Sequence, residues 1–480
     1  MVIAAFVILF AIFPLTDTDI WWHLACAREW VTTWTPVRTP VVNVHEYFQL
    51  LVGFVYGLGG APLLVAFKAV LWGAVFALFL RRRPCHLELV SGSAFLALTI
   101  IPLFFFRYHF EMRPVLFSLL FLGIFWNVLP RLFANGRLTP VNTLLAVLVL
   151  AIQWTWCKVQ GLYILGPLFA VLVLVAGIWN PCRAGDRPSR KALALRSAFV
   201  VALFAMPFLH KEGLNLFLYP FGLLDRLLGL SSSASIFASE IAENRSPFTL
   251  LMAGENTLEC VLMILFCVAG MGFAIWQLYK ARRPDILNVT LLITAILALV
   301  AERNFVLFLP VLLVTLPVPS KQLKLPTSFH IPRYSFTLVF LAFILGFWAR
   351  SLSAYDYSMV AYQRVPVHAA AWMVKHPHVG KLFNDDRAGG YLALMNPADS
   401  IYIDGRFILK TADFFERYLD YAKDPVLFMH DADSLGIDRA LFPLQYYARW
   451  DTLMQALQQD SRWHLAYRDE YFAVFDKILK

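Results

Sequence analysis

The apolar segments of this chain constrain its fold more than any other sequence feature, because several are long enough to cross a lipid bilayer. They lie at 1–16, 62–80, 91–106, 114–130, 142–157, 161–178, 196–209, 257–278, 287–300, 303–318 and 334–350. Lipid offers backbone groups no hydrogen-bond partner, so such segments must be helical. The composition agrees, since 59% of the 480 residues are hydrophobic and only 15% are charged. We therefore predict a polytopic α-helical membrane protein with about 11 transmembrane helices.

The basic residues between these segments indicate how the chain is oriented. If the N-terminus is cytoplasmic, the loops 81–90, 131–141, 179–197, 279–286 and 319–333 also face the cytoplasm and carry 16 Lys/Arg against three acids. The opposite loops carry 8 Lys/Arg against 11 acids. Because basic residues concentrate in cytoplasmic loops, we predict a multi-pass protein with its N-terminus in the cytoplasm.

The composition divides the chain into two parts. Residues 1–350 hold all the apolar segments, with a long first outer loop at 17–60 and a second outer segment at 210–256. Residues 351–480 hold 14 Lys/Arg and 17 Asp/Glu, and no apolar run among them is long enough to cross a bilayer. We expect this second part to be a soluble domain on the outer, periplasmic face of the membrane.

Short apolar runs alternate with helical patterns in the soluble part, which indicates a small α/β domain. Strands are expected at 379–384, at 400–404, around 439–442 and in a closing hairpin at 463–476. Gly389 and Gly390 do not form a dinucleotide fingerprint, because they belong to no G-x-G-x-x-G motif. We expect this pair to allow a tight turn from strand to helix.

Ionisable residues gather at the outward-facing ends of the apolar segments. They form six clusters: Asp17/Asp19/His23, Arg107/His109/Glu111/Arg113, Lys158/Gln160, His210/Lys211/Glu212, Glu240/Glu243/Arg245 and Glu302/Arg303/Asn304. Charged groups at membrane depth are costly, so they normally line water-filled cavities or pair with one another. Clusters on one face therefore predict a membrane-embedded site. The alternative is a set of interfacial arginines and structural ion pairs.

The first cluster, Asp17-Thr-Asp19-Ile-Trp21-Trp22-His23, carries the most specific chemistry. A carboxylate within reach of a hydroxyl group can act as a general base. An Asp-x-Asp pair can also hold a divalent metal ion when water and substrate complete the coordination. Asp17 and Asp19 are therefore candidate catalytic residues and candidate metal ligands. In the alternative interpretation, Asp17 only caps the next helix.

The order of these motifs resembles that in a bacterial group of polytopic proteins similar to GT-C glycosyltransferases, membrane enzymes that use polyprenyl-phosphate sugars. The matching motifs are Asp17-x-Asp19-x-Trp21-Trp22-His23-Leu24, Met112-Arg113-Pro114, Trp156-x-Lys158-x-Gln160-Gly161, Glu243-x-Arg245, Arg303-Asn304 and Asp404-Gly405-Arg406. The resemblance covers nearly the whole chain. It departs from the group's pattern at Lys158 and Gln160, where that pattern has Asn and His.

The resemblance implies an inverting enzyme of the bacterial cytoplasmic (inner) membrane. It would move a sugar from a polyprenyl-phosphate donor to a glycan, lipid or protein acceptor on the outer face, with Asp17 or Asp19 as the general base. Cations would stabilise the departing phosphate. The candidate residues for binding the substrate and its phosphate are His23, Arg107, Arg113, Lys158, Arg245, Arg303 and Asn304. A divalent metal ion at Asp17 and Asp19 is the one cofactor expected.

The Asp404-Gly405-Arg406 motif has two interpretations. Asp404 and Arg406 could contact the acceptor at the rim of the site. The local alternative, which we favour, is a turn in which Gly405 is left-handed and Asp404 pairs with Arg406.

Two other classes of function compete with the transferase. A non-catalytic scaffold or lipid-handling subunit of an envelope assembly is favoured by the departures at Lys158 and Gln160. A transporter is favoured less, because the sequence has no obvious internal repeat and few charges in the middle of its spans. Topology accounts for the basic residues, so the sequence gives no support to nucleic-acid binding.

Overall fold

The computed structural model describes residues 2–81, 92–134, 139–179, 189–282, 285–315, 335–445 and 448–478. They fall into two compact units. The first unit comprises Met1–Phe13, Ala66–Leu228 and Ala238–Tyr355, and the second comprises Pro14–Val65, Gly229–Phe237 and Asp356–Lys480. The first outer loop predicted at 17–60 therefore packs with the C-terminal residues in one unit.

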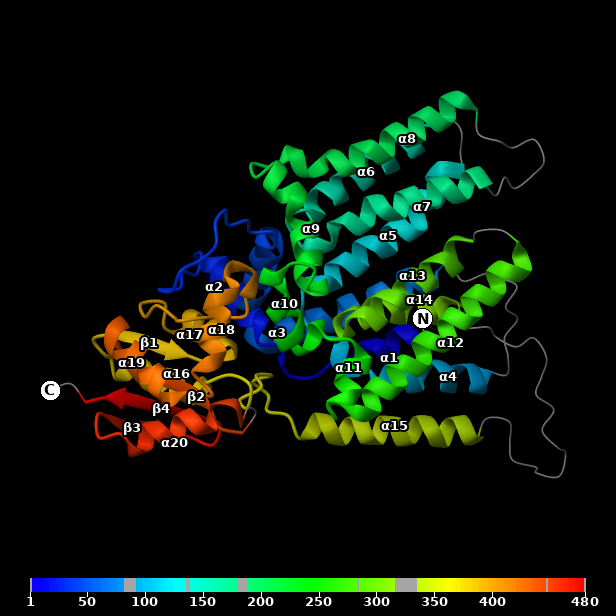
Figure 1. Cartoon of the computed structure of the whole chain (residues 1–480). Coiled ribbons are helices and arrows are strands. Elements are labelled where there is room, and N and C mark those ends of the chain that lie inside the picture. Colours follow the sequence, from blue (N-terminus) through cyan, green and yellow to red (C-terminus); the bar gives the residue numbers. More distant parts are fainter. Residues whose placement is uncertain are drawn as a thin grey trace. The chain divides into compact units, whose positions relative to one another are not determined.

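The first unit is built of helices. They are α1 (Val2–Phe10), α4 (Gly92–Phe105), α5 (Val115–Ala134), α6 (Pro140–Trp156), α7 (Leu165–Trp179), α8 (Arg190–Ala205), α9 (Leu214–Leu228), α11 (Pro247–Met252), α12 (Thr257–Ala281), α13 (Ile286–Val300), α14 (Phe305–Thr315) and α15 (Ser335–Ser353). The helices α5, α6, α7 and α8 lie side by side, and α12 packs against α13 (Figure 1). Short 3-10 helices follow several of them: η1 (Arg107–His109), η2 (Gly161–Ile164), η3 (Met206–Leu209), η4 (Ala242–Asn244) and η5 (Glu302–Asn304).

Five helical segments of the described chain are long and apolar enough to cross a membrane. They are Glu46–Leu80, Val115–Ala134, Gly161–Ile178, Arg190–Leu209 and Thr257–Ala281. Three shorter apolar helices, Pro140–Trp156, Ile286–Val300 and Leu341–Ser353, accompany them. The predicted multi-pass helical architecture is confirmed, whereas the count of about 11 spans stays a prediction.

Two helices have parts in both units. Helix α3 (Glu46–Leu80) is interrupted at Gly59 and Gly60, where Gly60 has a φ of 64° that favours glycine. Its first part precedes the apolar segment predicted at 62–80. Helix α10 (Ser232–Glu240) is the second shared element.

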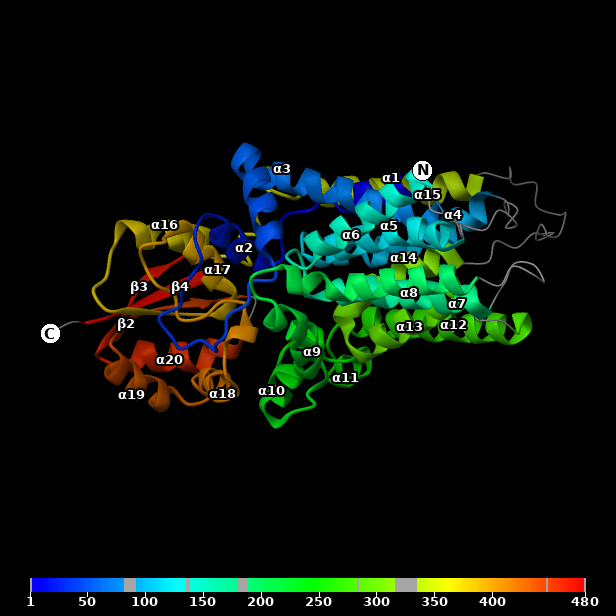
Figure 2. The same cartoon turned by 90° about the horizontal axis from the view of Figure 1, so that it is seen from above.

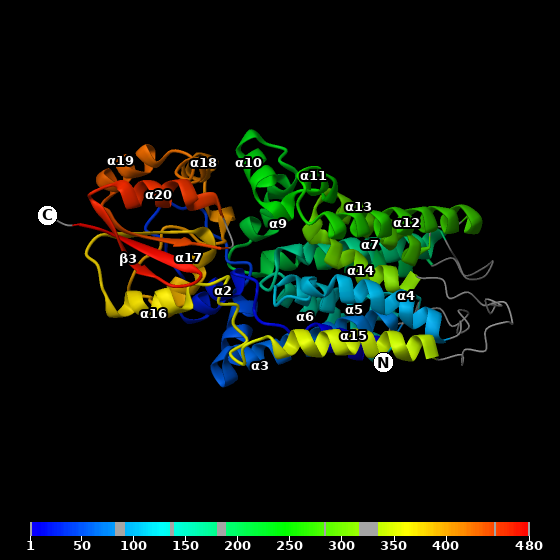
Figure 3. The same cartoon turned by 90° about the horizontal axis from the view of Figure 1, so that it is seen from below.

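The second unit contains a four-stranded sheet in the order β1 (Lys381–Asn384), β2 (Ile437–Pro443), β4 (Phe472–Lys477) and β3 (Trp463–Arg468). Strands β1 and β2 are parallel, and β4 runs antiparallel to both β2 and β3. Its helices are α2 (Asp19–Arg28), α16 (Val367–Lys375), α17 (Asp386–Met395), α18 (Ala412–Asp420), α19 (Pro425–Leu435) and α20 (Asp451–Gln459), with short turns η6 (Phe407–Leu409) and η7 (Ala448–Trp450). Figures 2 and 3 show α16 and α17 on one side of the sheet and α19 and α20 on the other. The predicted small α/β layer structure is thus present.

Two local predictions in this unit were wrong. The stretch 400–404 is not a strand of the sheet, because Ile401 forms only an isolated bridge with Thr33. The side chain of Asn384 instead accepts the Tyr402 N–H and donates to the Ile403 carbonyl, which satisfies this backbone without a ladder.

The second wrong prediction concerns Gly389 and Gly390, which lie inside α17 rather than in a turn. A Cβ on Gly389 would meet the carbonyl oxygen of Ile403 at 1.9 Å, and one on Gly390 would meet the backbone nitrogen of Trp22 at 2.7 Å. The two glycines therefore allow α17 to pack closely against α2 and the 401–404 segment.

Candidate functional site

The second unit brings the two most specific sequence motifs together. Asp19 is the first residue of α2, and its N–H donates to Asp17 Oδ1 at 3.3 Å. Asp17 is only 4% exposed, whereas Asp19 is half-buried. Asp17 therefore supports the helix start, as the capping alternative expected, and Asp19 is the more exposed carboxylate of the pair. Its negative charge is also favourable at the N-terminal end of the helix.

Gly405 is the point of contact between the two motifs. A Cβ built on Gly405 would lie 1.9 Å from Asp19 Oδ1, so any side chain here would occupy the position of the Asp19 carboxylate. The expectation of a left-handed glycine was wrong, because Gly405 is not among the residues with positive φ in the described chain. The glycine is needed for close approach rather than for its backbone angle.

The Asp404–Arg406 pair is confirmed as a local ion pair. Arg406 Nη2 lies 2.6 Å from Asp404 Oδ2, and both side chains are buried. Arg406 also donates to the Val31 carbonyl at 2.9 Å, and its guanidinium lies 4.8 Å from the centre of the Trp30 ring. These contacts hold the segment after α2 in position, because an arginine stacked and hydrogen-bonded in this way is already fully engaged.

His23 lies within an aromatic cluster of the second unit. Its ring is 2% exposed and lies 4.7 Å from the Phe48 ring and 5.1 Å from the His45 ring, centre to centre. Edge-to-face contacts of this kind belong to a packed core. A role for His23 in binding substrate therefore remains a prediction that the burial of its ring does not favour.

In the first unit, the span-end clusters meet through Arg113. The guanidinium donates to both oxygens of Glu243, at 2.7 and 2.6 Å, and its Nε lies 2.9 Å from Glu111 Oε2. Burial raises the pKa of the Glu243 carboxyl, but the charge and hydrogen bonds of Arg113 outweigh it and hold the pKa at about 2. Arg113 thus already has two carboxylate partners.

The other predicted cations of this unit have partners of different kinds. Lys158 Nζ lies 2.6 Å from Glu212 Oε1, and Arg245 donates to Glu255 at 2.7 Å. Arg303 differs, because it is exposed and donates at 2.9 Å to the neutral side chain of Asn244. Arg303 thus has an exposed guanidinium that, among the described residues, contacts a neutral amide.

Arg107 and Asn304 make local contacts. Arg107 donates to the Phe104 carbonyl at 2.8 Å and lies 4.3 Å from the centre of the Tyr108 ring. Asn304 donates to the Leu297 carbonyl at 3.0 Å. Both contacts secure the turn at the end of a helix.

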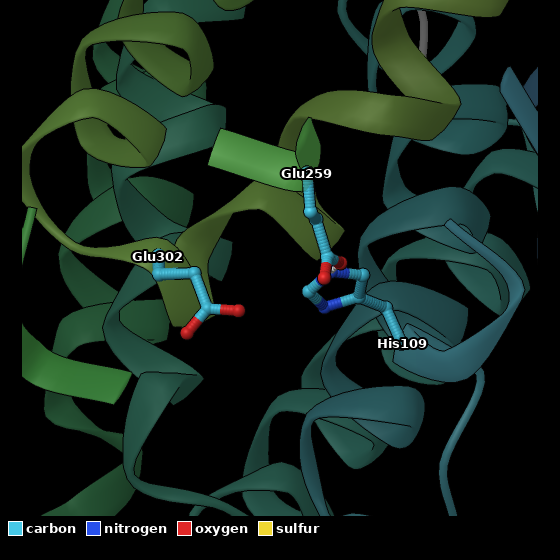
Figure 4. A group of neighbouring side chains, drawn as sticks. All are labelled: His109, Glu259 and Glu302. Atoms are coloured by element: carbon cyan, nitrogen blue, oxygen red, sulfur yellow. Dashed lines mark hydrogen bonds and ion pairs between the residues drawn. The ribbon is translucent and has the colours of Figure 1, made fainter. Parts of the chain in front are cut away.

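A third group in the first unit joins His109 to two carboxylates. His109 Nε2 lies 2.9 Å from Glu259 Oε1, and the Glu302 carboxylate faces the same ring (Figure 4). Burial lowers the pKa of His109, but its hydrogen bond to Glu259 and the charges of Glu302, Glu259 and Glu111 raise it overall. Burial also raises the pKa of Glu302. These shifts mark a site that is rich in negative charge.

Sequence reasoning did not single out Glu259, because it lies inside the apolar segment predicted at 257–278. A signal existed, since a carboxylate in the first turn of an apolar span is costly unless it has a partner. Its partner His109 is 150 residues away, so spacing along the chain could not identify the pair.

Comparison with known proteins identifies the fold. No protein-family model matches this sequence, and no curated protein matches it. Three solved structures of the oligosaccharyltransferase AglB from the archaeon Archaeoglobus fulgidus are similar. The structure in complex with an inhibitory peptide and a dolichol-phosphate has a TM-score of 0.55 at 12% identity, over 92% of this chain and 68% of that one.

The other two structures agree with the first. The apo form gives a TM-score of 0.54 at 11% identity, over 92% of this chain and 69% of that one. The form tethered to an acceptor peptide with the NVT sequon gives 0.51 at 12% identity, over 92% and 68%. The predicted resemblance to GT-C membrane glycosyltransferases is therefore confirmed as a likeness of fold.

Proposed function

We propose that this chain is a membrane glycosyltransferase of the GT-C type, which moves a sugar from a polyprenyl-phosphate donor to an acceptor hydroxyl or amide. The observation that carries the proposal is the position of Asp19: a half-buried carboxylate at the head of α2, in a chain with the fold of an oligosaccharyltransferase. The dolichol-phosphate bound to that relative is a polyprenyl phosphate, which is the chemical class of the proposed leaving group.

In the proposed reaction, Asp19 takes the proton of the acceptor group. The acceptor atom then forms a bond to the anomeric carbon on the face opposite the phosphate. The bond between that carbon and the phosphate oxygen breaks, and the polyprenyl phosphate leaves with the electron pair, which inverts the configuration. Asp17 holds the head of α2 and so orients Asp19.

A cation must stabilise the phosphate as it leaves. Arg303 is the best candidate among the described cations of the predicted set, because it is exposed and donates to a neutral amide. Arg113 and Lys158 are weaker candidates, since each lies within 2.7 Å of a carboxylate oxygen. A divalent ion held by Asp19 and Asp17 would supply further positive charge.

The same proposal places the enzyme in a bacterial cytoplasmic membrane, with residues 351–480 on the periplasmic side and the reaction on that face. This orientation is supported by the excess of Lys/Arg in the loops assigned to the cytoplasm. The donor then comes from the outer leaflet, and the acceptor is a glycan, a lipid or a protein. The acceptor peptide bound to a relative favours a peptide within this range.

A non-catalytic scaffold is the second candidate, and one observation favours it. Three cations predicted to bind phosphate, Arg113, Lys158 and Arg245, instead form ion pairs within the chain. A subunit that retained the architecture but not the chemistry would need such pairs only for stability.

The experiment that separates the two is turnover of radiolabelled polyprenyl-phosphate sugars by the purified full chain in lipid. Asp19→Asn should lower transfer by roughly 100-fold or more, the range of a general base. Asp420→Asn, an exposed carboxylate at the end of α18, serves as the matched control and should leave transfer unchanged. No transfer from any donor by folded wild type would favour the scaffold. Full activity of Asp19→Asn would overturn the assignment of the base.

A further inference from the structure

Three side chains with metal-binding atoms converge in the first unit. His109 comes from η1, Glu259 from the first turn of α12, and Glu302 from η5. One ligand atom from each lies within 4.8 Å of the others. Figure 4 shows the Glu259 carboxylate against the imidazole ring and the Glu302 carboxylate pointing toward the ring from a separate segment. Three separate elements therefore present nitrogen and oxygen donors to one small volume.

The carboxylate of Glu302 has the fewest hydrogen-bonding contacts of the three described side chains. Among the residues that the structure describes, no side chain or backbone N–H donates a hydrogen bond to its carboxylate, although the residue is only partly exposed. Glu259 differs, because His109 already donates to it or accepts its proton at 2.9 Å. A half-buried carboxylate that points at such a pair without a donor of its own is costly unless something positive lies between them.

The charged groups around these three side chains are also mostly negative. Carboxylates outnumber guanidinium groups among these neighbours, so negative charge is in excess. The interacting groups are the carboxylates Glu111, Glu243, Glu259 and Glu302 and the guanidinium groups of Arg113 and Arg303. One divalent cation would offset this excess.

We propose that His109, Glu259 and Glu302 bind one divalent transition-metal ion, with Zn²⁺ as the best fit. An imidazole among carboxylates favours zinc over magnesium or calcium, which prefer oxygen ligands alone. Zinc binds nitrogen and carboxylate oxygen at about 2.0–2.2 Å in a roughly tetrahedral arrangement. The ion replaces the hydrogen bond between His109 Nε2 and Glu259 Oε1, and Glu302 moves toward it by side-chain rotation.

Three protein ligands leave one position of a four-coordinate ion open. Water or an anionic oxygen, such as that of a phosphate, is the class of ligand this position would take. The donor set differs from that of the pair Asp17 and Asp19, because it includes an imidazole nitrogen whereas that pair offers only oxygen. The existence of the metal site does not rest on the proposed glycosyl transfer.

Metal content of the purified full chain tests the site directly. The protein in detergent is stripped with a chelator, equilibrated with Zn²⁺, dialysed, and measured for zinc per chain by mass spectrometry. Co²⁺ in place of Zn²⁺ reports the ligand set through its visible absorption. We expect one ion per wild-type chain and at least 10-fold weaker binding by Glu302→Gln and by His109→Gln.

Two variants keep the result interpretable. Glu302→Gln keeps the shape of the side chain and removes no hydrogen bond within the described structure, so its fold should be intact even if His109→Gln is unstable. Glu416→Gln, an exposed carboxylate of α18, is the matched control and should bind as wild type. Wild type without zinc, or Glu302→Gln with unchanged affinity, overturns the proposal. Zinc that is lost only with Asp17→Asn and Asp19→Asn places the ion at that pair instead and also overturns it.

Discussion

The Lys158–Glu212 ion pair can be used to test whether Lys158, one of the predicted phosphate ligands, instead stabilises the fold. The two charges lie 2.6 Å apart, with the Lys158 side chain 3% exposed and that of Glu212 14% exposed. Burial raises the pKa of Glu212, but the hydrogen bond and charge of Lys158 lower it overall. Removing one partner of a buried pair leaves an uncompensated charge, which typically costs 3–5 kcal/mol. Since Glu212 retains some solvent, we expect Lys158→Met to lower the free energy of unfolding by about 3 kcal/mol.

A double-mutant cycle isolates the interaction from the other contacts of each side chain. Glu212→Gln should cost about 2 kcal/mol, and the double variant about 3 kcal/mol, which corresponds to a coupling energy of about 2 kcal/mol. The assay is unfolding of the full chain in mixed micelles, followed by tryptophan fluorescence. A coupling below about 0.5 kcal/mol would refute the reasoning and return Lys158 to the set of candidate phosphate ligands.

Three further predictions address other parts of the chain. Gly405→Ala places a Cβ 1.9 Å from Asp19 Oδ1 and should displace the carboxylate. Sugar transfer should then fall roughly 100-fold, with little loss of stability. Gly57→Ala is the control, because Gly57 has open space around it, and it should leave transfer and stability unchanged. Equal activity of the two variants would separate Asp19 from the chemistry. His378, between Asp438 and Asp399, has its pKa raised to about 9 despite burial, so its stabilisation is present below pH 6.5 and is lost as the pH rises through 9. The free energy of unfolding should fall between pH 6 and pH 10 by about 3 kcal/mol more in wild type than in His378→Gln, and a variant that kept the full difference would contradict the assignment. Arg303→Gln should raise KM for the donor about 10-fold without lowering stability, because the side chain is exposed, and an unchanged KM would count against phosphate binding.

The helical architecture and much of the sheet were predictable because they depend on local patterns. Apolar length predicted membrane helices such as Thr257–Ala281. Alternation along 463–476 predicted the hairpin of β3 and β4. The same kind of pattern failed at 400–404, where the side chain of Asn384 satisfies the backbone in place of a neighbouring strand. A single side-chain amide can satisfy backbone groups that would otherwise pair with a neighbouring strand. The local sequence pattern does not predict such a contact.

The candidate site was predictable as a list of residues but not as a set of contacts. The span-end clusters do meet, yet Arg113 and Glu243 are 130 residues apart, and sequence alone does not pair them. Gly405 was expected to serve a turn, whereas its neighbour is Asp19 from the other end of the chain. Tertiary packing determines these partners. Charge and spacing in the sequence can therefore indicate candidate residues, but they do not predict which of them are in contact.

The departures at Lys158 and Gln160 were the main sequence argument for a scaffold. The contacts of these two residues weaken that argument. Lys158 is paired with Glu212, and the Gln160 side chain accepts the Leu162 N–H at the start of η2. Both residues therefore have structural tasks in this turn. A residue that has been adapted to hold a turn does not show that chemistry elsewhere was lost. The decision between enzyme and scaffold then depends on Asp19, which is half-buried and placed against a glycine that leaves it room. If Asp19→Asn and Gly405→Ala both abolish transfer while the Lys158 variants lose only stability, the transferase is established with its base in the second unit.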